Sequence, residues 1–154
     1  MSPRAACRLE SLGFSAVFDY VGGKRDWAGG GFPIEGQKAQ ELRAGSLARR
    51  DVLTVRLGDR VGDIARRAEG NGYDVAVVLT ADGVVLGIID PDALVPPSTA
   101  TAEKVMRPGP ATYRPDVPVK ELLEKLLPKR LRRALVTTPE GRLLGIFYTD
   151  DVPS

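Results

Sequence analysis

Two segments of this chain, residues 54–94 and 112–152, are copies of one unit, and this repeat restricts the possible folds more than any other feature. Each residue of the first copy corresponds to the residue 58 positions later, and the alignment contains no gap. The identical pairs include Thr54/Thr112, Val61/Val119, Ala76/Ala134, Gly83/Gly141, Gly87/Gly145 and Asp92/Asp150. A long unit that occurs only twice does not indicate a stacked solenoid. The repeat instead predicts a tandem pair of small subdomains that face each other.

The first copy has the pattern of a strand, a helix, two strands and a short helix. Strands are expected at residues 53–57, 75–79 and 84–89, where apolar and β-branched residues dominate. The helix between the first two strands begins near Asp59 and ends at residues 70–72, which contain two glycines. The run 75–79 is almost entirely apolar, which indicates a strand that is buried on both faces.

The helix of the second copy carries a wider apolar stripe. Pro118 begins this helix and Pro128 ends it. The stripe consists of Val119, Leu122, Leu123, Leu126 and Leu127. Two interpretations remain open: the helix packs better in its own core, or it has a second partner surface, as in a homodimer.

Composition excludes several kinds of site. The 154 residues contain no histidine, so catalysis by Ser-His-Asp or Cys-His groups and histidine-based metal sites are excluded. The single cysteine, Cys7, cannot form an internal disulfide, which favours a reducing cytoplasm. The N-terminal residues lack the apolar run of a signal peptide, and no apolar stretch approaches the roughly 20 residues that span a bilayer. A net charge of +2 indicates a mixed surface, unlike that of a dedicated nucleic-acid binder.

The end of the second copy, Glu140–Val152, contains a turn glycine, an apolar pair, a second glycine, an apolar strand, a hydroxyl-bearing residue and an aspartate. This order resembles the cystathionine-β-synthase (CBS) domain, and Thr101–Met106 resembles the short helix that begins a second CBS copy. The resemblance covers Arg49–Val152. It implies an α+β fold with α/β character, in which tandem β-α-β-β-α repeats form a pseudo-two-fold Bateman module.

The resemblance also implies a function. CBS pairs are not enzymes; they usually bind adenine nucleotides or related adenosyl ligands between the copies, and they commonly dimerise. We therefore expect a regulatory protein that binds AMP, ADP, ATP or a ligand of the S-adenosylmethionine class, with no catalytic residues, no metal and no separate cofactor. The expected partners are a second copy of the chain and a regulated protein, in the cytoplasm and away from membranes.

The family pattern places one ligand site in the second copy. The ribose carboxylate falls on Asp151, and the hydroxyl position falls on Tyr148, with Thr149 one residue out of register. A carboxylate where a strand enters a helix can accept hydrogen bonds from both ribose hydroxyls. The expected ligand-binding set is Asp151, Thr112, Tyr148, Thr149, Arg133 and Ile146. In the alternative interpretation, Asp151 only caps the last helical turn.

The corresponding site in the first copy is expected to be degenerate. Its carboxylate position is Ala93, and its hydroxyl position is Asp90, whose negative charge disfavours a nearby phosphate. Thr54 is the corresponding residue of the first strand. At most one nucleotide per chain is therefore expected, at the second-copy site.

Residues 1–36 resemble the last third of a rhodanese-like domain. A helix that stops at Gly13, a strand over residues 16–20, Trp27 and a Gly-x-Pro sequence at residues 31–33 follow one another as in that family. The resemblance implies a helix-strand-helix stub.

The stub is expected to lack sulfurtransferase activity. The catalytic cysteine of rhodanese-like domains precedes the helix, whereas Cys7 lies within it. Cys7 is therefore expected to be a small buried apolar residue. An isolated strand has no neighbours to satisfy its amides, so the stub should dock on the repeats through Phe14, Phe18 and Trp27.

The expected organisation is the partial rhodanese-like segment (1–36), a polar, partly helical linker (37–50), a first CBS domain (51–98) and a second CBS domain (99–154). Two other functions remain open: a ligand-free dimerisation or scaffold module and, less favoured, a nucleic-acid-associated protein that uses the basic run Lys129–Arg133. The absence of aromatic residues from that run argues against a platform for single strands.

Overall fold

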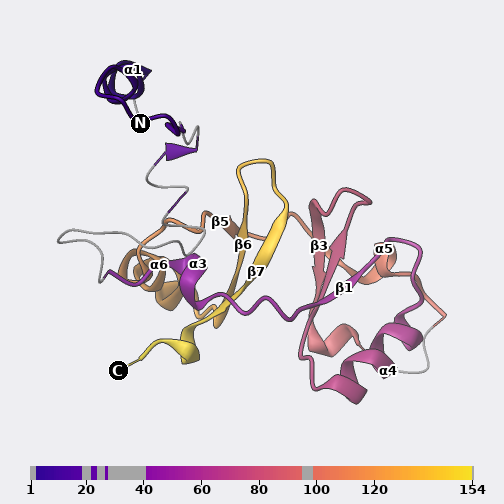
Figure 1. Cartoon of the computed structure of the whole chain (residues 1–154). Helices are drawn as coiled ribbons and strands as arrows, with labels where there is room; N and C mark the ends of the chain where they lie inside the picture. Colours follow the sequence, from indigo (N-terminus) through magenta and orange to yellow (C-terminus); the bar gives the residue numbers. More distant parts are fainter. Residues whose placement is uncertain (1–2, 19–21, 24–26, 28–40, 95–98, 154) are drawn as a thin grey trace.

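The computed structural model describes residues 3–18, 22–23, 27, 41–94 and 99–153 (Figure 1). The elements of the first repeat are β1 (Leu53–Val55), α4 (Val61–Asn71), β2 (Ala76–Leu79), β3 (Val85–Ile89) and the 3-10 turn η1 (Pro91–Ala93). Those of the second are β5 (Thr112–Tyr113), α6 (Val119–Leu126), the turn η2 (Leu127–Lys129), β6 (Arg133–Thr137), β7 (Leu143–Tyr148) and the turn η3 (Thr149–Asp151). In both repeats the first strand pairs parallel with the second, and the second pairs antiparallel with the third. The predicted mixed α+β fold of two matching units is confirmed.

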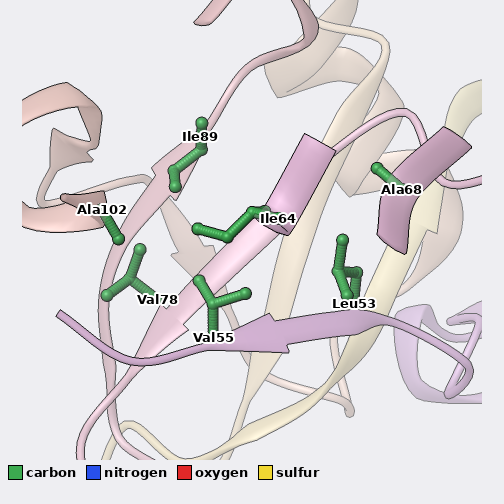
Figure 2. Close-up of a cluster of buried hydrophobic side chains, with 8 residues drawn as sticks. Leu53, Val55, Ile64, Ala68, Val78, Ile89 and Ala102 are labelled. Atoms are coloured by element: carbon green, nitrogen blue, oxygen red, sulfur yellow. The ribbon is translucent and has the colours of Figure 1, made fainter. Parts of the chain in front are cut away.

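The strand β2 is apolar throughout because both of its faces are covered. Ala76 and Val78 lie in the core of the first repeat together with Ile64 of α4, and Figure 2 shows part of this cluster. Successive side chains of a strand point to opposite faces, so Val77 faces the other way. It lies in a cluster with Ile146 of the second repeat. The sheets of the two repeats therefore pack face to face, and each covers the inner face of the other.

The segment that begins each repeat packs on the other repeat. The helix α3 (Ala44–Leu47) places the fully buried Ala44 in the core of the second repeat. The helix α5 (Ala102–Val105) places the fully buried Ala102 in the core of the first repeat. The amide of Ala44 donates to the carbonyl of Val117, and 58 positions later the amide of Ala102 donates to Asp59. The two repeats are thus joined by a reciprocal exchange of their first helices.

The exchange continues into the strand that follows each short helix. The strand β4 (Arg107–Pro108) pairs antiparallel with β3, and Arg49 forms the equivalent bridge to Ile146 of β7. The described part of the predicted linker, residues 41–50, is therefore packed into the fold and does not simply connect two units. Residues 43–49 are the counterparts of 101–107, so the repeat begins earlier than the sequence comparison indicated.

Two glycines let the exchanged segments approach the sheets closely. A Cβ atom on Gly145 would lie 2.6 Å from the carbonyl oxygen of Arg49 and 3.1 Å from the Cβ of Ala48. A Cβ atom on Gly87 would lie 2.6 Å from the Sδ of Met106 and 3.0 Å from the carbonyl oxygen of Arg107. Non-bonded carbon and oxygen atoms do not approach within 2.6 Å, so Gly145 requires glycine for packing, whereas a side chain at Gly87 would first have to displace Met106.

The exposed apolar surface at α6 is smaller than the sequence predicted. Leu122 and Leu126 are fully buried in the core of the second repeat, and Leu123 is half-buried. Leu127 is 60% exposed, because the chain turns into η2 directly after α6.

Within the described residues, the chain has no helix with the length and apolarity to cross a membrane.

The N-terminal segment differs from its prediction in several respects. The helix α1 (Pro3–Ser11) forms as expected, and the left-handed Gly13 follows it. Cys7 is exposed, so the prediction that it is buried is wrong; α1 lies apart from both sheets in Figure 1, and no core covers it. Phe14 and Phe18 are 60% and 83% exposed, and the prediction that they anchor the segment is also wrong. Trp27 is 37% exposed, less buried than an anchor would be. Residues 16–18 form no strand, and the rest of the predicted strand lies outside the described residues.

Candidate ligand clefts between the repeats

Two cavities lie between the repeats and are related by the same offset of 58 residues. The first, here called the Tyr148 cleft, measures about 440 Å³ and combines Ile146 and Tyr148 with the first-repeat residues 49–53 and 71–75. The second, the Asp90 cleft, measures about 290 Å³ and combines Ile88 and Asp90 with residues of the second repeat. These volumes fall near the lower end of the range of roughly 300–1,000 Å³ that is typical of small-molecule sites. Each cleft joins the end of the third strand of one repeat to the first strand of the other.

The structure divides the predicted site residues between the two clefts. Tyr148 and Ile146 line the Tyr148 cleft, and the carboxylate of Asp151 binds Arg49, another lining residue. Arg133 lines the Asp90 cleft instead. Arg133 pairs in register with Tyr148 on β7, but its side chain also binds Asp90 of the first repeat and therefore lines the cleft that was predicted to be degenerate.

The threonines of the first strands also lie near other clefts than predicted. Thr112 is exposed on β5, whose neighbouring residues Ala111 and Tyr113 line the Asp90 cleft. Thr54 is exposed on β1, beside Leu53, which lines the Tyr148 cleft. Neither threonine is among the lining residues of the clefts. Each lies near the cleft opposite to the one predicted.

The remaining predicted residues have structural contacts of their own. The hydroxyl of Thr149 donates to the carbonyl of Arg132, at 3.3 Å, and so ties η3 to the loop before β6. Ala93 packs, half-buried, against the core of the first repeat. Asp151 is the last residue of η3, a turn that has no side-chain cap, so the alternative that Asp151 caps this turn is wrong.

The Tyr148 cleft is organised by two paired carboxylates. Asp151 accepts hydrogen bonds from Nε of Arg49 at 2.6 Å and from Nη2 at 2.5 Å, and this pair lowers the pKa of Asp151. The Arg49 guanidinium also lies 4.6 Å from the centre of the Tyr148 ring, as in a cation–π contact. The Tyr148 hydroxyl donates to Asp74 at 2.8 Å. Burial, followed by this hydrogen bond, raises the pKa of Tyr148 to about 12.

The Asp90 carboxylate is neutralised by two arginines. Nη2 of Arg107 lies 3.1 Å from Oδ2, and Nη2 of Arg133 lies 2.7 Å from Oδ1. The predicted unfavourable effect of the Asp90 charge on a phosphate took no account of these two arginines. Nη1 of Arg133 also lies 3.0 Å from Asp74, so Arg133 connects a carboxylate of one cleft to a carboxylate of the other.

Three residues that line the clefts, Arg49, Asp74 and Arg107, were not among those predicted from the sequence. The repeat could have identified the two arginines, because Arg49 and Arg107 are 58 residues apart and therefore occupy equivalent positions of the two copies. Asp74 has no acidic counterpart in the second repeat, where Arg132 takes its place, and no repeat comparison could identify it. Among the described residues, no group of three or more Asp, Glu, Cys or His side chains could hold a metal ion. Apolar walls with arginines and carboxylates suit binding of a polar ligand.

Comparisons with known proteins identify the same two units. Residues 44–95 and 102–152 each match the CBS domain family. An uncharacterized protein of Methanopyrus kandleri, MK0525, is 26% identical over 121 residues, which cover 73% of this chain and 62% of that protein. The chain thus spans less than two thirds of the length of this relative.

Two solved structures have a similar fold. The cytosolic domain of the Mg2+ channel MgtE in complex with ATP has a TM-score of 0.65 and 24% identity, over 73% of this chain and 49% of that one. The CBS domain pair of protein MJ0100 in complex with 5'-methylthioadenosine and S-adenosyl-L-methionine has a TM-score of 0.62 and 18% identity, over 72% and 92%. At these identities the similarity concerns the fold. The rhodanese-like resemblance of residues 1–36 gains no support from these comparisons or from the exposed helix α1.

Proposed function

Because the chain belongs to the CBS domain family and carries two copies of the domain, we propose that it is a regulatory module that binds an adenosyl ligand between the copies. The main support is the pair of equivalent clefts, each built from both repeats and each containing an apolar wall, arginines and a polar residue at the end of a third strand. Proteins of the same fold have been solved with ATP and with S-adenosyl-L-methionine. The proposed role is regulatory rather than catalytic, in the cytoplasm.

The proposed adenosyl site is the Tyr148 cleft, with Asp151 as the ribose acceptor. Arg49 holds this carboxylate, but its side chain is 58% exposed, and exposed ion pairs contribute little to stability. A ribose that offers two hydroxyl donors can displace Arg49 at a small energetic cost. The Arg49 guanidinium then becomes available to a ligand phosphate or carboxylate at the mouth of the cleft.

Ligand occupancy can reach a partner because both repeats contribute to each cleft. A ligand that binds one relative position of the repeats more tightly than another shifts the population toward that position. The ion pairs of Arg133 with Asp74 and Asp90 cross this boundary and would be the first contacts to change. The regulated partner would recognise the resulting arrangement.

Calorimetric titration with AMP, ATP and S-adenosylmethionine tests the proposal, with GTP as the comparison. Asp151→Ala should weaken adenosyl binding by about 1.5–3 kcal/mol, the range for a hydrogen bond to a charged group, which is roughly tenfold or more. Asp150→Ala, in the same turn, is the matched control, because Asp150 is exposed and its carboxylate accepts a hydrogen bond from the adjacent Thr149 and none from Arg49 among the described residues. Equal affinities for the parent and the Asp151 variant, or no adenosyl binding at all, would refute the proposed site.

A ligand-free scaffold is the second candidate, since the carboxylates of both clefts are already satisfied by arginines of the chain. We also propose a homodimer through the outer face of α6 and the adjoining turn η2, where Leu127 is exposed. Two-fold association is the commonest arrangement for soluble oligomers. A scaffold would dimerise without adenosyl ligands affecting its stability, whereas a sensor would be stabilised by them.

A further inference from the structure

Arg49 makes the contacts in the Tyr148 cleft that a cationic ligand would need. Its guanidinium donates to Asp151 at 2.6 and 2.5 Å and lies 4.6 Å from the centre of the Tyr148 ring. The face of an aromatic ring attracts cations because the ring quadrupole places negative charge there. The Arg49 side chain is 58% exposed, so another group can replace it at little cost. The cleft therefore combines a carboxylate and a ring face that together bind a displaceable cation.

The ring of Tyr148 is fixed in place independently of Arg49. Its hydroxyl donates to Asp74 at 2.8 Å, and Asp74 also lies 3.0 Å from Nη1 of Arg133. Tyr148 is half-buried at the end of β7. The side chain is thus held both at the strand and at its hydroxyl, so the ring face stays available when Arg49 leaves.

The equivalent positions of the other cleft are occupied differently. The residue equivalent to Tyr148 is Asp90, and the residue equivalent to Asp74 is Arg132. Four arginines and one aspartate line the Asp90 cleft, whereas two arginines line the Tyr148 cleft together with Asp51 and Asp74. The Tyr148 cleft is therefore the less positive of the two, and it is the cleft in which a cation already lies on an aromatic ring.

A ligand that displaces Arg49 has to replace both of its contacts. The two ribose hydroxyls of an adenosyl group can replace the hydrogen bonds to Asp151. The substituent on the 5′ carbon lies next to the ribose, and its charge determines the contact with Tyr148. A sulfonium there restores a cation on the ring face, whereas a 5′-phosphate brings a negative charge to it.

We propose that the Tyr148 cleft selects adenosyl ligands with a sulfonium at the 5′ carbon over those with a 5′-phosphate, and that Tyr148 determines this selectivity. The inference rests on the proposed function, because it concerns the ligand of the same cleft. S-adenosylmethionine belongs to this sulfonium class. Its ammonium group suits a wall that contains Asp51 and Asp74, and its carboxylate suits the displaced Arg49 guanidinium.

The experiment measures, by calorimetry on the full chain, the affinities for S-adenosylmethionine, S-adenosylhomocysteine and AMP. The first two share the adenosine and amino acid parts, but the sulfur is a cationic sulfonium in one and a neutral thioether in the other. S-adenosylmethionine should bind about 5- to 30-fold more tightly than S-adenosylhomocysteine, the factor expected for a partly to fully desolvated cation–π contact, and more tightly than AMP. Tyr148→Phe retains the ring and should retain the preference, whereas Tyr148→Leu should abolish it.

Tyr113→Leu is the matched control, because it removes a tyrosine ring from the Asp90 cleft. It should leave all three affinities unchanged, and a loss of affinity in this variant would place the ligand in the other cleft and overturn the inference. Equal affinities for S-adenosylmethionine and S-adenosylhomocysteine, a preference that survives Tyr148→Leu, or AMP binding as tight as that of S-adenosylmethionine would also overturn it, and would leave the adenosyl proposal intact. If no adenosyl compound binds, the proposed function is refuted and this inference with it.

Discussion

Gly145→Ala tests the exchange of first helices that holds the two repeats together. The added Cβ would lie 2.6 Å from the Arg49 carbonyl oxygen, a backbone atom that cannot move alone. Arg49 and Ile146 exchange two backbone hydrogen bonds of 2.8 and 2.9 Å at this point. The methyl group must therefore push residues 48–49 away from β7 and stretch both bonds.

The expected loss of stability is about 3–5 kcal/mol if both hydrogen bonds are lost. Each of the two backbone hydrogen bonds contributes about 1 kcal/mol, and forcing a methyl group into a packed contact costs about 1–3 kcal/mol. Gly87→Ala should cost less, about 1 kcal/mol, because the nearest atom there is the Sδ of Met106, at the end of a flexible side chain. The ranking of the two variants is a sharper test than either value.

Urea unfolding followed by far-UV circular dichroism gives these free energies, since the single tryptophan lies outside the repeats. Gly70→Ala is the control: Gly70 lies in α4 with nothing near its Cβ position, and alanine there should stabilise by up to about 1 kcal/mol. A Gly145 variant as stable as the parent, or one less affected than the Gly87 variant, would refute the described packing.

Two further predictions concern a titration and a surface. The pKa of Tyr148 is raised from 10.0 to about 12, so the folded state favours the neutral phenol; this contribution to stability is complete below pH 10 and is lost as the pH rises from 10 to about 12. In a titration followed by tyrosinate absorbance, Tyr148→Phe should remove the ionisation near pH 12, and Asp74→Asn should lower the pKa of Tyr148. Titration curves of both variants that match the parent would contradict the hydrogen bond between Tyr148 and Asp74. Leu127→Glu should change the free energy of unfolding by less than about 0.5 kcal/mol, and in sedimentation it should convert the dimer to a monomer. Leu126→Glu should instead unfold the second repeat, because Leu126 is fully buried. A parent that is monomeric at micromolar concentration would reject the dimer.

The order of elements in the repeats could be predicted because local patterns determine it. The run Val75–Leu79 must be covered on both faces, and the turn at Gly83 joins it to the next strand, so a helix and a facing sheet follow from the pattern. Gly87 and Gly145 coincide in the repeat, but only the structure shows that a neighbouring backbone lies against them.

The exchange of first helices could not be predicted from the local pattern. The helix α3 is only four residues long, and Ala44 is its only fully buried residue, so its sequence resembles a polar linker. The pairing of Arg49 with Asp151 spans 102 residues, and neither position indicates the other. Tyr148 and Asp90, at the ends of the third strands, line the two clefts, whereas Arg133, which was predicted to act together with Asp151, lines the Asp90 cleft.

The most direct test of the central claim is a crystal structure of the chain grown with AMP. The account predicts the nucleotide in the Tyr148 cleft, with both ribose hydroxyls on Asp151 and the Arg49 guanidinium moved away from that carboxylate. A nucleotide bound outside the two clefts, or a crystal with saturating AMP in which Arg49 still holds Asp151 and no nucleotide lies between the repeats, would contradict it.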